Sequence, residues 1–126
     1  MTRILVVDDD PDITLAFKKG LENDGFQVDT FNDPGAALSK FEPSRYDLLL
    51  LDVRMPEMNG FELYREIKKI DSKVKVCFIT AFEVYYEALR EVFPSLEVEC
   101  FIRKPVEISN LVKKIRAELI KPNHVK

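Results

Sequence analysis

The sequence predicts an α/β fold with a doubly wound, five-stranded parallel sheet and five helices. Apolar runs alternate with helical patterns five times along the chain, and right-handed crossovers between such units make the strands parallel, with helices on both faces. The strands also differ in polarity. Residues 4–7, 48–51 and, apart from Lys75, 74–79 form apolar runs, whereas residues 27–31 and 98–102 alternate between apolar and polar. We therefore expect the first three at the centre and the last two at the edges, in the order 2-1-3-4-5.

Length, composition and charge limit the class of protein. The 126 residues suffice for one domain, at residues 1–120 with a tail over 121–126, and are too few for two. The formal net charge is −3, with acidic and basic residues interspersed, so there is no electrostatic reason to expect direct binding of nucleic acid. No apolar run approaches membrane-spanning length, and no signal-peptide pattern opens the chain. We therefore expect no membrane contact and a cytoplasmic location.

The two cysteines, Cys77 and Cys100, lie in apolar strand patterns and lack the spacing of metal ligands. The sequence favours buried, reduced thiols, because a free cysteine behaves as a small apolar residue. Reduced thiols also agree with the expected cytoplasmic location.

The first helix directly follows the first strand. Pro11 suits its first turn, and Gly25 ends it. Gly20 lies in the helix interior, where glycine is unfavourable, so we expect it to pack closely against the sheet. The spacing of three and four residues predicts the buried face of this helix: Ile13, Ala16, Phe17, Gly20 and Leu21.

Four further helices are predicted from caps and apolar spacing. Residues 32–34 cap the second helix, which ends near Pro43. The third spans residues 60–70, the fourth spans 83–93 before a proline, and the last spans 107–120. Basic residues favour the carboxyl end of the last helix and form a solvated face there: Lys113, Lys114, Arg116 and Lys121.

Polar residues stand where the central strands end. Asp8 and Asp9 follow the first strand, with Asp10 as a third candidate. Asp52 follows the four leucines of the third strand. Because parallel strands end on the same rim, where such folds bind ligands, these acids should lie together. The fourth and fifth strands add Thr80 and Lys104, and a cis peptide before Pro105 would hold the lysine backbone in a tight turn.

Carboxylates that converge in this way repel one another unless a cation is present. Oxygen ligands without histidine or cysteine suit Mg²⁺, which keeps several waters and shares phosphate oxygens. Asp9 would ligate the ion directly, and Asp8 directly or through water. The site therefore predicts phosphoryl chemistry, with Asp52 as the nucleophile that forms an aspartyl phosphate. Lys104 and Thr80 would contact the phosphoryl oxygens.

These residues, in this order and spacing, resemble the receiver domain of the two-component response regulators over essentially the whole chain. The architecture is flavodoxin-like and similar to that of the stand-alone chemotaxis regulator. Each motif alone is weak, but the set is highly specific. It consists of the acidic pair after Ile-Leu-Val-Val, Asp52 in Leu-Asp-Val-Arg-Met-Pro-Glu-Met-Asn-Gly, Thr80 before Ala81, and Lys104 before Pro105.

The resemblance implies a signalling switch that is no enzyme beyond self-catalysed phosphotransfer and slow autodephosphorylation. A sensor histidine kinase or a phosphotransfer protein would donate the phosphoryl group to Asp52. An unknown downstream protein, or a second copy in a phosphorylation-dependent dimer, would bind the face formed by helix four, strand five and helix five. The resemblance also implies a set of Mg²⁺ ligands: Asp8, Asp9, Asp52 and the backbone carbonyl of Arg54.

The same resemblance implies roles for two further pairs of residues. Thr80 and Phe101 would form the switch, because receivers carry an aromatic residue three positions before the lysine, whose rotamer follows the hydroxyl. Arg54 and Phe82, two residues after the phosphoacceptor and the hydroxyl, flank the approach of the hydrolytic water and would tune the lifetime of the phosphorylated state. The segment Phe93–Leu96 departs from the family's usual Gly-Ala turn, so the resemblance describes the output face less well than the site.

A Mg²⁺-dependent phosphatase with an aspartyl-phosphate intermediate is the main alternative. Phosphatases of the haloacid dehalogenase kind need a second acid two residues after the nucleophile, where this chain has Arg54, and a cap domain for which no residues remain. A flavodoxin-like phosphate-binding module would need a glycine-rich loop where Asp8, Asp9 and Asp10 stand. A receiver used only as a scaffold would lack some of the acids, and none is missing.

Overall fold

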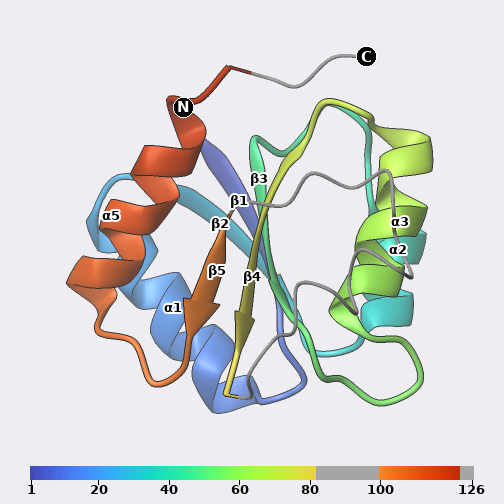
Figure 1. Ribbon diagram of the computed structural model, residues 1–126, viewed down its shortest axis with the longest axis horizontal. Helices are drawn as coiled ribbons and strands as arrows, with labels where there is room; N and C mark the ends of the chain where they lie inside the picture. The colour runs from blue at the N-terminus through green and yellow to red at the C-terminus, as the bar shows by residue number, and fades with distance from the viewer. Residues whose placement is uncertain (82–99, 123–126) are drawn as a thin grey trace.

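The centre of the fold is a five-stranded parallel sheet (Figure 1). The computed structural model describes residues 1–81 and 100–122 of the chain. The strands follow the order β2-β1-β3-β4-β5, which confirms the order predicted from strand polarity. Their bounds are β1 (Arg3–Val7), β2 (Gln27–Phe31), β3 (Leu48–Asp52), β4 (Lys75–Thr80) and β5 (Phe101–Arg103).

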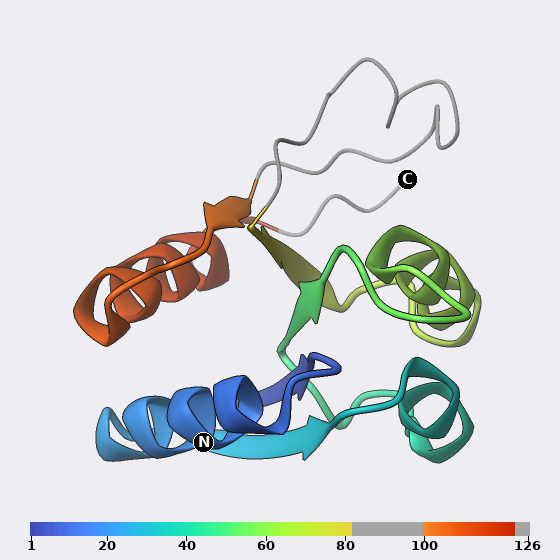
Figure 2. The ribbon, with the colours of Figure 1, turned by 90° about the horizontal axis from the view of Figure 1, so that it is seen from below.

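Helices cover both faces of the sheet, as a doubly wound fold requires. Figure 2 shows α1 and α5 on one face and α2 and α3 on the other. Their bounds are α1 (Pro11–Asn23), α2 (Pro34–Lys40), α3 (Gly60–Ile70) and α5 (Ile108–Leu119). None of the helices in the described part of the chain has the length and apolar character needed to cross a membrane. The helix expected over 83–93 and the segment Phe93–Leu96 lie outside the described residues.

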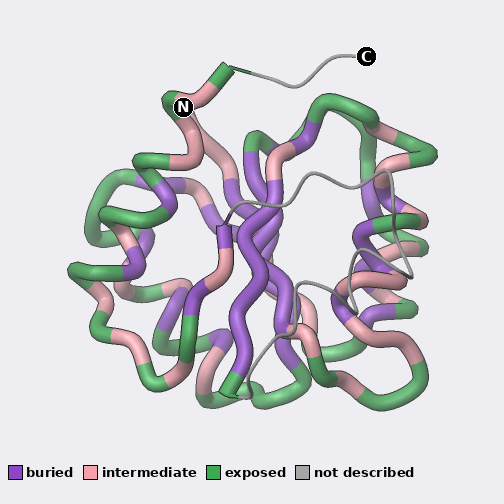
Figure 3. Tube along the Cα trace, viewed as in Figure 1, coloured by how far each residue is buried: buried purple, intermediate pink, exposed green. Residues whose placement is uncertain are grey.

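The core has two halves, one on each face of the sheet. Leu5 and Leu49 pack with the residues of α2 and α3, whereas Ile4 and Leu48 pack with those of α1 and α5. All four side chains are fully buried, and Figure 3 shows that buried residues concentrate in the central strands. Because both faces are covered, successive residues of these strands are apolar, whichever face they point to.

Short polar residues fix where each helix begins. The Asp10 side chain accepts a hydrogen bond from the backbone N–H of Asp12 at the start of α1. Asp33 caps α2 in the same way, and Asn59 forms a capping box at the start of α3. Such caps satisfy backbone donors that the first helical turn leaves without partners. Two of these helices, α1 and α2, start within four residues of the preceding strand, and α3 starts against the Asp52 backbone.

Two expectations for α1 were wrong. Ala16, predicted to face inward, is exposed, and Thr14 is buried in its place. The buried residues Thr14, Phe17 and Leu21 are spaced three and four apart, and a hydroxyl on this stripe was overlooked because apolar residues alone were counted. Gly20 packs against α5 and not against the sheet, since a Cβ there would lie 2.6 Å from Ile108 Cγ2.

The prediction of reduced thiols was also wrong, because Cys77 and Cys100 form a disulfide. β4 and β5 pair with Phe78 opposite Phe101, so the residues just before them also face each other. The two Cα atoms are 4.6 Å apart, a separation that permits a disulfide. The two strand patterns, considered separately, contain no information about this pairing. The disulfide removes the argument for a cytoplasmic location that rested on free thiols.

Candidate functional site

The strands end on one rim, at the lower edge of the sheet in Figure 1, and bring distant residues together there. Asp8 and Asp9 follow β1, and Asp52 is the last residue of β3. One carboxylate oxygen from each of these three residues lies within 4.8 Å of the others. Asp8 and Asp52 are buried, with 1% and 5% of their surface exposed, whereas Asp9 is exposed. The cluster is therefore anchored in the core and open to solvent on one side.

Lys104 connects this acidic cluster to β4. Its Nζ lies 2.6 Å from Asp8 Oδ2 and 3.6 Å from Asp52 Oδ2. Its backbone N–H donates to the carbonyl of Thr80 at 2.9 Å. Thr80 ends β4 with 4% of its surface exposed, and the Lys104–Pro105 peptide is cis. One cation thus lies against two carboxylates and beside the buried threonine.

The electrostatics of the rim favour a further cation. Burial, and then the negative charge of Asp8, raise the pKa of Asp52 well above its ordinary value, to about 6. The charge of Lys104 and a hydrogen bond from the Arg54 backbone lower this pKa but do not offset the rise. Ionisation of Asp52 in the metal-free protein therefore costs more free energy than ionisation of a free aspartate side chain. A divalent cation among the three acids would relieve that penalty.

Asp8 is held at every polar atom. Its four partners come from three segments, the end of β2, the β1–α1 loop and the residue after β5, so protein groups alone hold it in place. Its N–H donates to Phe31 O (3.2 Å), its carbonyl accepts from Asn32 Nδ2 (2.9 Å), Oδ1 accepts from the Asp10 N–H (2.9 Å), and Oδ2 accepts from Lys104 Nζ (2.6 Å).

The third acid of the β1–α1 loop has another task. The Asp10 carboxylate accepts from the N–H of Asp12 at 2.9 Å and begins α1. Asp10 therefore serves as a helix cap, and the acidic cluster consists of Asp8, Asp9 and Asp52.

The start of α3 lies directly against the end of β3. A Cβ on Gly60 would lie 2.3 Å from the backbone oxygen of Asp52. The N–H of Gly60 also donates to the carbonyl of Val53 at 3.0 Å. The closeness of Gly60 to the Asp52 backbone could not be read from the sequence. Gly60 thus sets how near α3 comes to Asp52.

Two of the remaining predicted residues, Phe101 and Arg54, lie in the described part of the chain. The Phe101 ring stacks on Phe78 with centroids 5.7 Å apart and meets Phe61 edge-on at 6.4 Å. Phe101 is half-buried, and Arg54 is exposed. Phe82 lies outside the described residues. Phe101 therefore packs against two aromatic rings on the face of the sheet that α3 covers.

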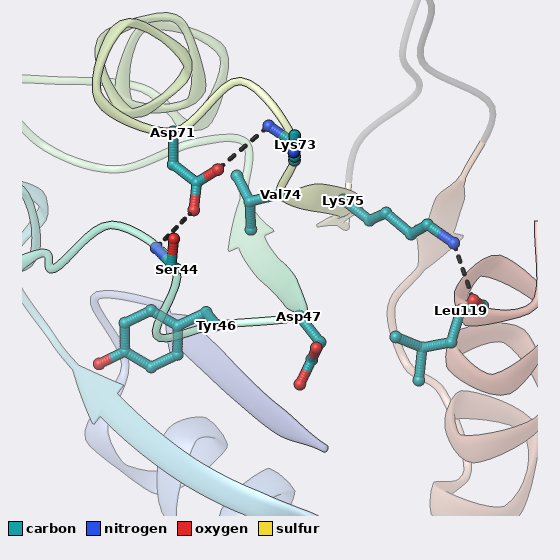
Figure 4. Close-up of a pocket in the computed structure, with 8 residues that line it drawn as sticks. All are labelled: Ser44, Tyr46, Asp47, Asp71, Lys73, Val74, Lys75 and Leu119. Atoms are coloured by element: carbon teal, nitrogen blue, oxygen red, sulfur yellow. Dashed lines mark hydrogen bonds between the residues drawn. The ribbon is translucent and has the colours of Figure 1, made fainter. Parts of the chain in front are cut away.

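A hollow lies at the end of the strands opposite the acidic cluster (Figure 4). Asp71 accepts from the backbone N–H groups of Ser44 and Lys73, at 2.9 and 3.1 Å. Lys75 donates to the carbonyls of Glu118 and Leu119 at the end of α5, at 3.0 and 2.8 Å. These polar groups tie neighbouring segments to one another, so we assign this hollow a structural role.

Comparison with known proteins points to one family. The model of the response regulator receiver domain matches residues 4–116. The response regulator receiver protein CpdR of Brucella abortus is 35% identical over 120 residues, which cover 95% of this chain and 98% of that protein. The transcriptional regulatory protein TrcR of Mycobacterium tuberculosis is 28% identical over 123 residues, covering 98% of this chain and 47% of that protein. The chain thus spans nearly all of one relative and about half of the other.

Similar solved structures point to the same family. The non-phosphorylated HemR receiver domain of Leptospira biflexa is 28% identical, with a TM-score of 0.84 over 100% of both chains. The response regulator TrrA of Thermotoga maritima, in complex with Mg²⁺-BeF, is 33% identical, with a TM-score of 0.80 over 95% of this chain and 100% of that one. The fold, the acidic rim and these likenesses lead to one conclusion: the chain belongs to the receiver-domain family of two-component response regulators.

Proposed function

We propose that this receiver domain is a phosphoacceptor switch in which Asp52 takes a phosphoryl group from a sensor histidine kinase or a phosphotransfer protein. The observation that carries the proposal is the convergence of three carboxylates within 4.8 Å, beside the Lys104 ammonium group. Carboxylates and a mobile cation at the carboxyl ends of parallel strands provide a nucleophile, metal ligands and charge neutralisation in one place. Membership of the receiver family supports the same function.

The donor set fits Mg²⁺, because it consists of oxygens alone and one of its acids has a raised pKa. The residues that would hold the ion are Asp8, Asp9, Asp52 and, through its backbone carbonyl, Arg54. When bound, Mg²⁺ neutralises part of the charge on the transferring phosphoryl oxygens. A relative in complex with Mg²⁺-BeF supports this choice of metal.

Three residues of the chain carry out the phosphoryl transfer itself. A carboxylate oxygen of Asp52 attacks phosphorus while the bond from phosphorus to the donor histidine nitrogen breaks, and that nitrogen keeps the electron pair. Lys104 then exchanges its contact with Asp8 for a phosphoryl oxygen, and the Thr80 hydroxyl donates to another. Water later hydrolyses the aspartyl phosphate, which resets the switch.

The assignment of Asp52 is tested with a small acyl phosphate as donor. The wild-type protein should gain the mass of one phosphoryl group in the presence of Mg²⁺ and lose this gain when a chelator is added. Asp52→Asn should gain nothing. Label that survives this substitution, or that ignores the chelator, refutes the assignment. Rapid multiple turnover of the donor, with no accumulated label, would instead favour the phosphatase alternative.

The output requires a change of shape, for which we propose the pair Thr80 and Phe101. When a phosphoryl group draws the Thr80 hydroxyl inward, the space it vacates becomes available to the Phe101 ring, which reshapes the face of β5. The contacts of Phe101 with Phe78 and Phe61 supply an apolar site for that ring. The ring resonances of Phe101 should shift on addition of a phosphoryl mimic in the wild type and not in Thr80→Ala. Identical shifts in both proteins would refute the coupling.

The partners follow from this chemistry. The phosphodonor is a histidine kinase or a phosphotransfer protein, and the output passes to another protein or to a second copy of the chain. A cytoplasmic location is part of the proposal because a kinase domain that uses ATP lies inside the cell, not because of the cysteines, which form a disulfide.

A further inference from the structure

Asn32 joins three elements beside the acidic cluster. It is the first residue after β2, and its Nδ2 donates to the backbone oxygen of Asp8 and to Thr14 Oγ1, both at 2.9 Å. Asp8 follows β1, and Thr14 lies in the first turns of α1. A single amide group therefore ties the end of β2 to the loop that carries two of the acids and to the helix that follows it.

The surroundings define which end of the Asn32 amide points inward. A backbone carbonyl can only accept, so the atom that faces Asp8 O must be the NH₂ group. The Thr14 hydroxyl donates to Pro11 O at 3.1 Å, which leaves its lone pairs free to accept from the same NH₂ group. Thr14 is buried, with 4% of its surface exposed. Its hydroxyl is thus a fixed acceptor that helps to orient Asn32.

The bond to Asp8 acts on both metal-ligating acids. The Asp8 carbonyl belongs to the peptide plane that joins Asp8 to Asp9, and this plane is rigid. The hydrogen bond from Asn32 to this oxygen fixes the rotation of the peptide plane. It therefore also sets the direction in which the chain continues into Asp9. The N–H of Asp8 donates a hydrogen bond to the carbonyl oxygen of Phe31, the residue before Asn32. The end of β2 therefore holds the Asp8 backbone on both sides.

We propose that Asn32, oriented by Thr14, is a positioning residue that sets the geometry of Asp8 and Asp9 for a divalent cation. The inference rests on the proposed function, because it concerns the same site. Residues that orient ligands from behind typically change metal affinity by about 10- to 100-fold when they are replaced. Asn32→Ala should therefore weaken Mg²⁺ binding by about tenfold or more. Thr14→Val, which keeps the shape but loses the acceptor, should weaken it in the same direction.

The experiment measures the Kd for Mg²⁺ of the unphosphorylated protein by titration calorimetry, with Mn²⁺ paramagnetic resonance as a second probe. The variants are Asn32→Ala, Thr14→Val, Thr14→Ser and the double variant Asn32→Ala/Thr14→Val. Thr14→Ser keeps the hydroxyl and should bind nearly as the wild type does. The double variant should bind Mg²⁺ about as weakly as Asn32→Ala alone. Thr14 acts only by orienting Asn32, so its replacement has no further effect once Asn32 is gone.

Asp33→Ala is the matched control. Asp33 is the neighbour of Asn32 and caps α2 through Ala36 N. Its loss should lower the Tm, measured in chelator, and leave the Mg²⁺ Kd within about twofold of wild type, since a lost cap costs stability and not ligand geometry.

Two results overturn the inference. One is an Asn32→Ala protein whose Kd lies within twofold of wild type, and the other is an equal loss of affinity in Asp33→Ala. If Asn32→Ala does not fold, the Mg²⁺ Kd values of Thr14→Val and Thr14→Ser are compared instead. Equal Kd values for these two variants would overturn the inference. A wild-type protein that binds no Mg²⁺ and accepts no phosphoryl group would overturn the proposed function and this inference together. Normal wild-type binding with unchanged variants overturns the inference alone.

Discussion

At the scale of single residues, the proposed function depends on Asp52, a carboxylate whose burial makes its charged form less stable than that of a free aspartate side chain. Asp52 closes an apolar strand with 5% of its surface exposed, and Asp8 lies next to it with 1%. Lys104 contacts both but does not restore the ordinary pKa of Asp52, which burial and the charge of Asp8 raise to about 6. The metal-free site is therefore electrostatically unfavourable, and either Mg²⁺ or a neutral side chain at position 52 should relieve it.

Asp52→Asn should stabilise the metal-free protein at neutral pH. Because the pKa of Asp52 is raised on folding to about 6, the folded chain binds more protons than the unfolded chain between about pH 4 and 6, and stability falls as the pH rises through that range. Asparagine removes this loss, so the free energy of unfolding should rise by about 2 kcal/mol above pH 6 and by little near pH 4. The free energy of unfolding of both proteins is measured by urea denaturation at several pH values, with a chelator present. The exposed Asp12→Asn serves as control, and the same pH trend in that variant would contradict the explanation.

The lifetime of the phosphorylated state should depend on Arg54 and Phe82. Hydrolysis needs a water in line with the leaving carboxylate oxygen; Phe82 cannot hydrogen-bond that water, and Arg54 is long enough to lie across the phosphoryl group. We expect a lifetime roughly tenfold or more above that of the chemotaxis regulator, which corresponds to ~1.4 kcal/mol of lost water positioning. Decay is timed after removal of the donor in wild type, Arg54→Asn, Phe82→Glu and the double variant. A double variant that decays no faster than wild type would show that these side chains do not set the rate.

At the scale of helices and strands, caps and close contacts place the site. Strand order could be predicted because the central strands are apolar on both faces, and helix starts could be predicted from Asp33 and Pro11. The burial of Thr14 was missed because only apolar residues were counted on the buried stripe of α1. The packing of Gly20 on Ile108 could not be predicted, because it depends on how far apart α1 and α5 lie. Such distances are set by the assembled core, and a pattern along one segment does not contain them.

Gly60→Ala should damage both stability and the site. A Cβ would lie 2.3 Å from Asp52 O and 3.1 Å from Asp52 C, and backbone atoms cannot move aside as a side chain can. We expect a loss of about 1–3 kcal/mol, typical of overpacking, and slower phosphoryl acceptance because Asp52 itself must shift. Gly35→Ala is the matched control, since its nearest neighbour, Asp33 Oδ2, is 3.5 Å away. Denaturation and labelling rates are compared, and equal stability of the two variants would contradict this packing.

At the scale of the whole molecule, topology explains why the site was predictable. In a parallel sheet every strand ends on the same rim, so Asp8, Asp52 and Lys104 had to converge once the strand order was known. Contacts that link a side chain to distant backbone, such as Asn32 to Asp8, follow from no such rule. The disulfide escaped prediction for a related reason: only the register of β4 and β5 places its two cysteines opposite each other.

The last prediction concerns that disulfide, which closes a covalent ring from β4 to β5. Cys77 and Cys100 are 23 residues apart in the sequence, and both are buried in the core half beneath α1 and α5. A crosslink of this span restricts the unfolded chain, so its reduction should lower the free energy of unfolding by about 3 kcal/mol. Thiol trapping of the unfolded protein should find no free thiol before reduction and two afterwards. The variant Cys77→Ala/Cys100→Ala should be insensitive to reductant. Two free thiols in the unreduced protein, or equal stability with and without reductant, would show that the bond does not hold β5 to β4.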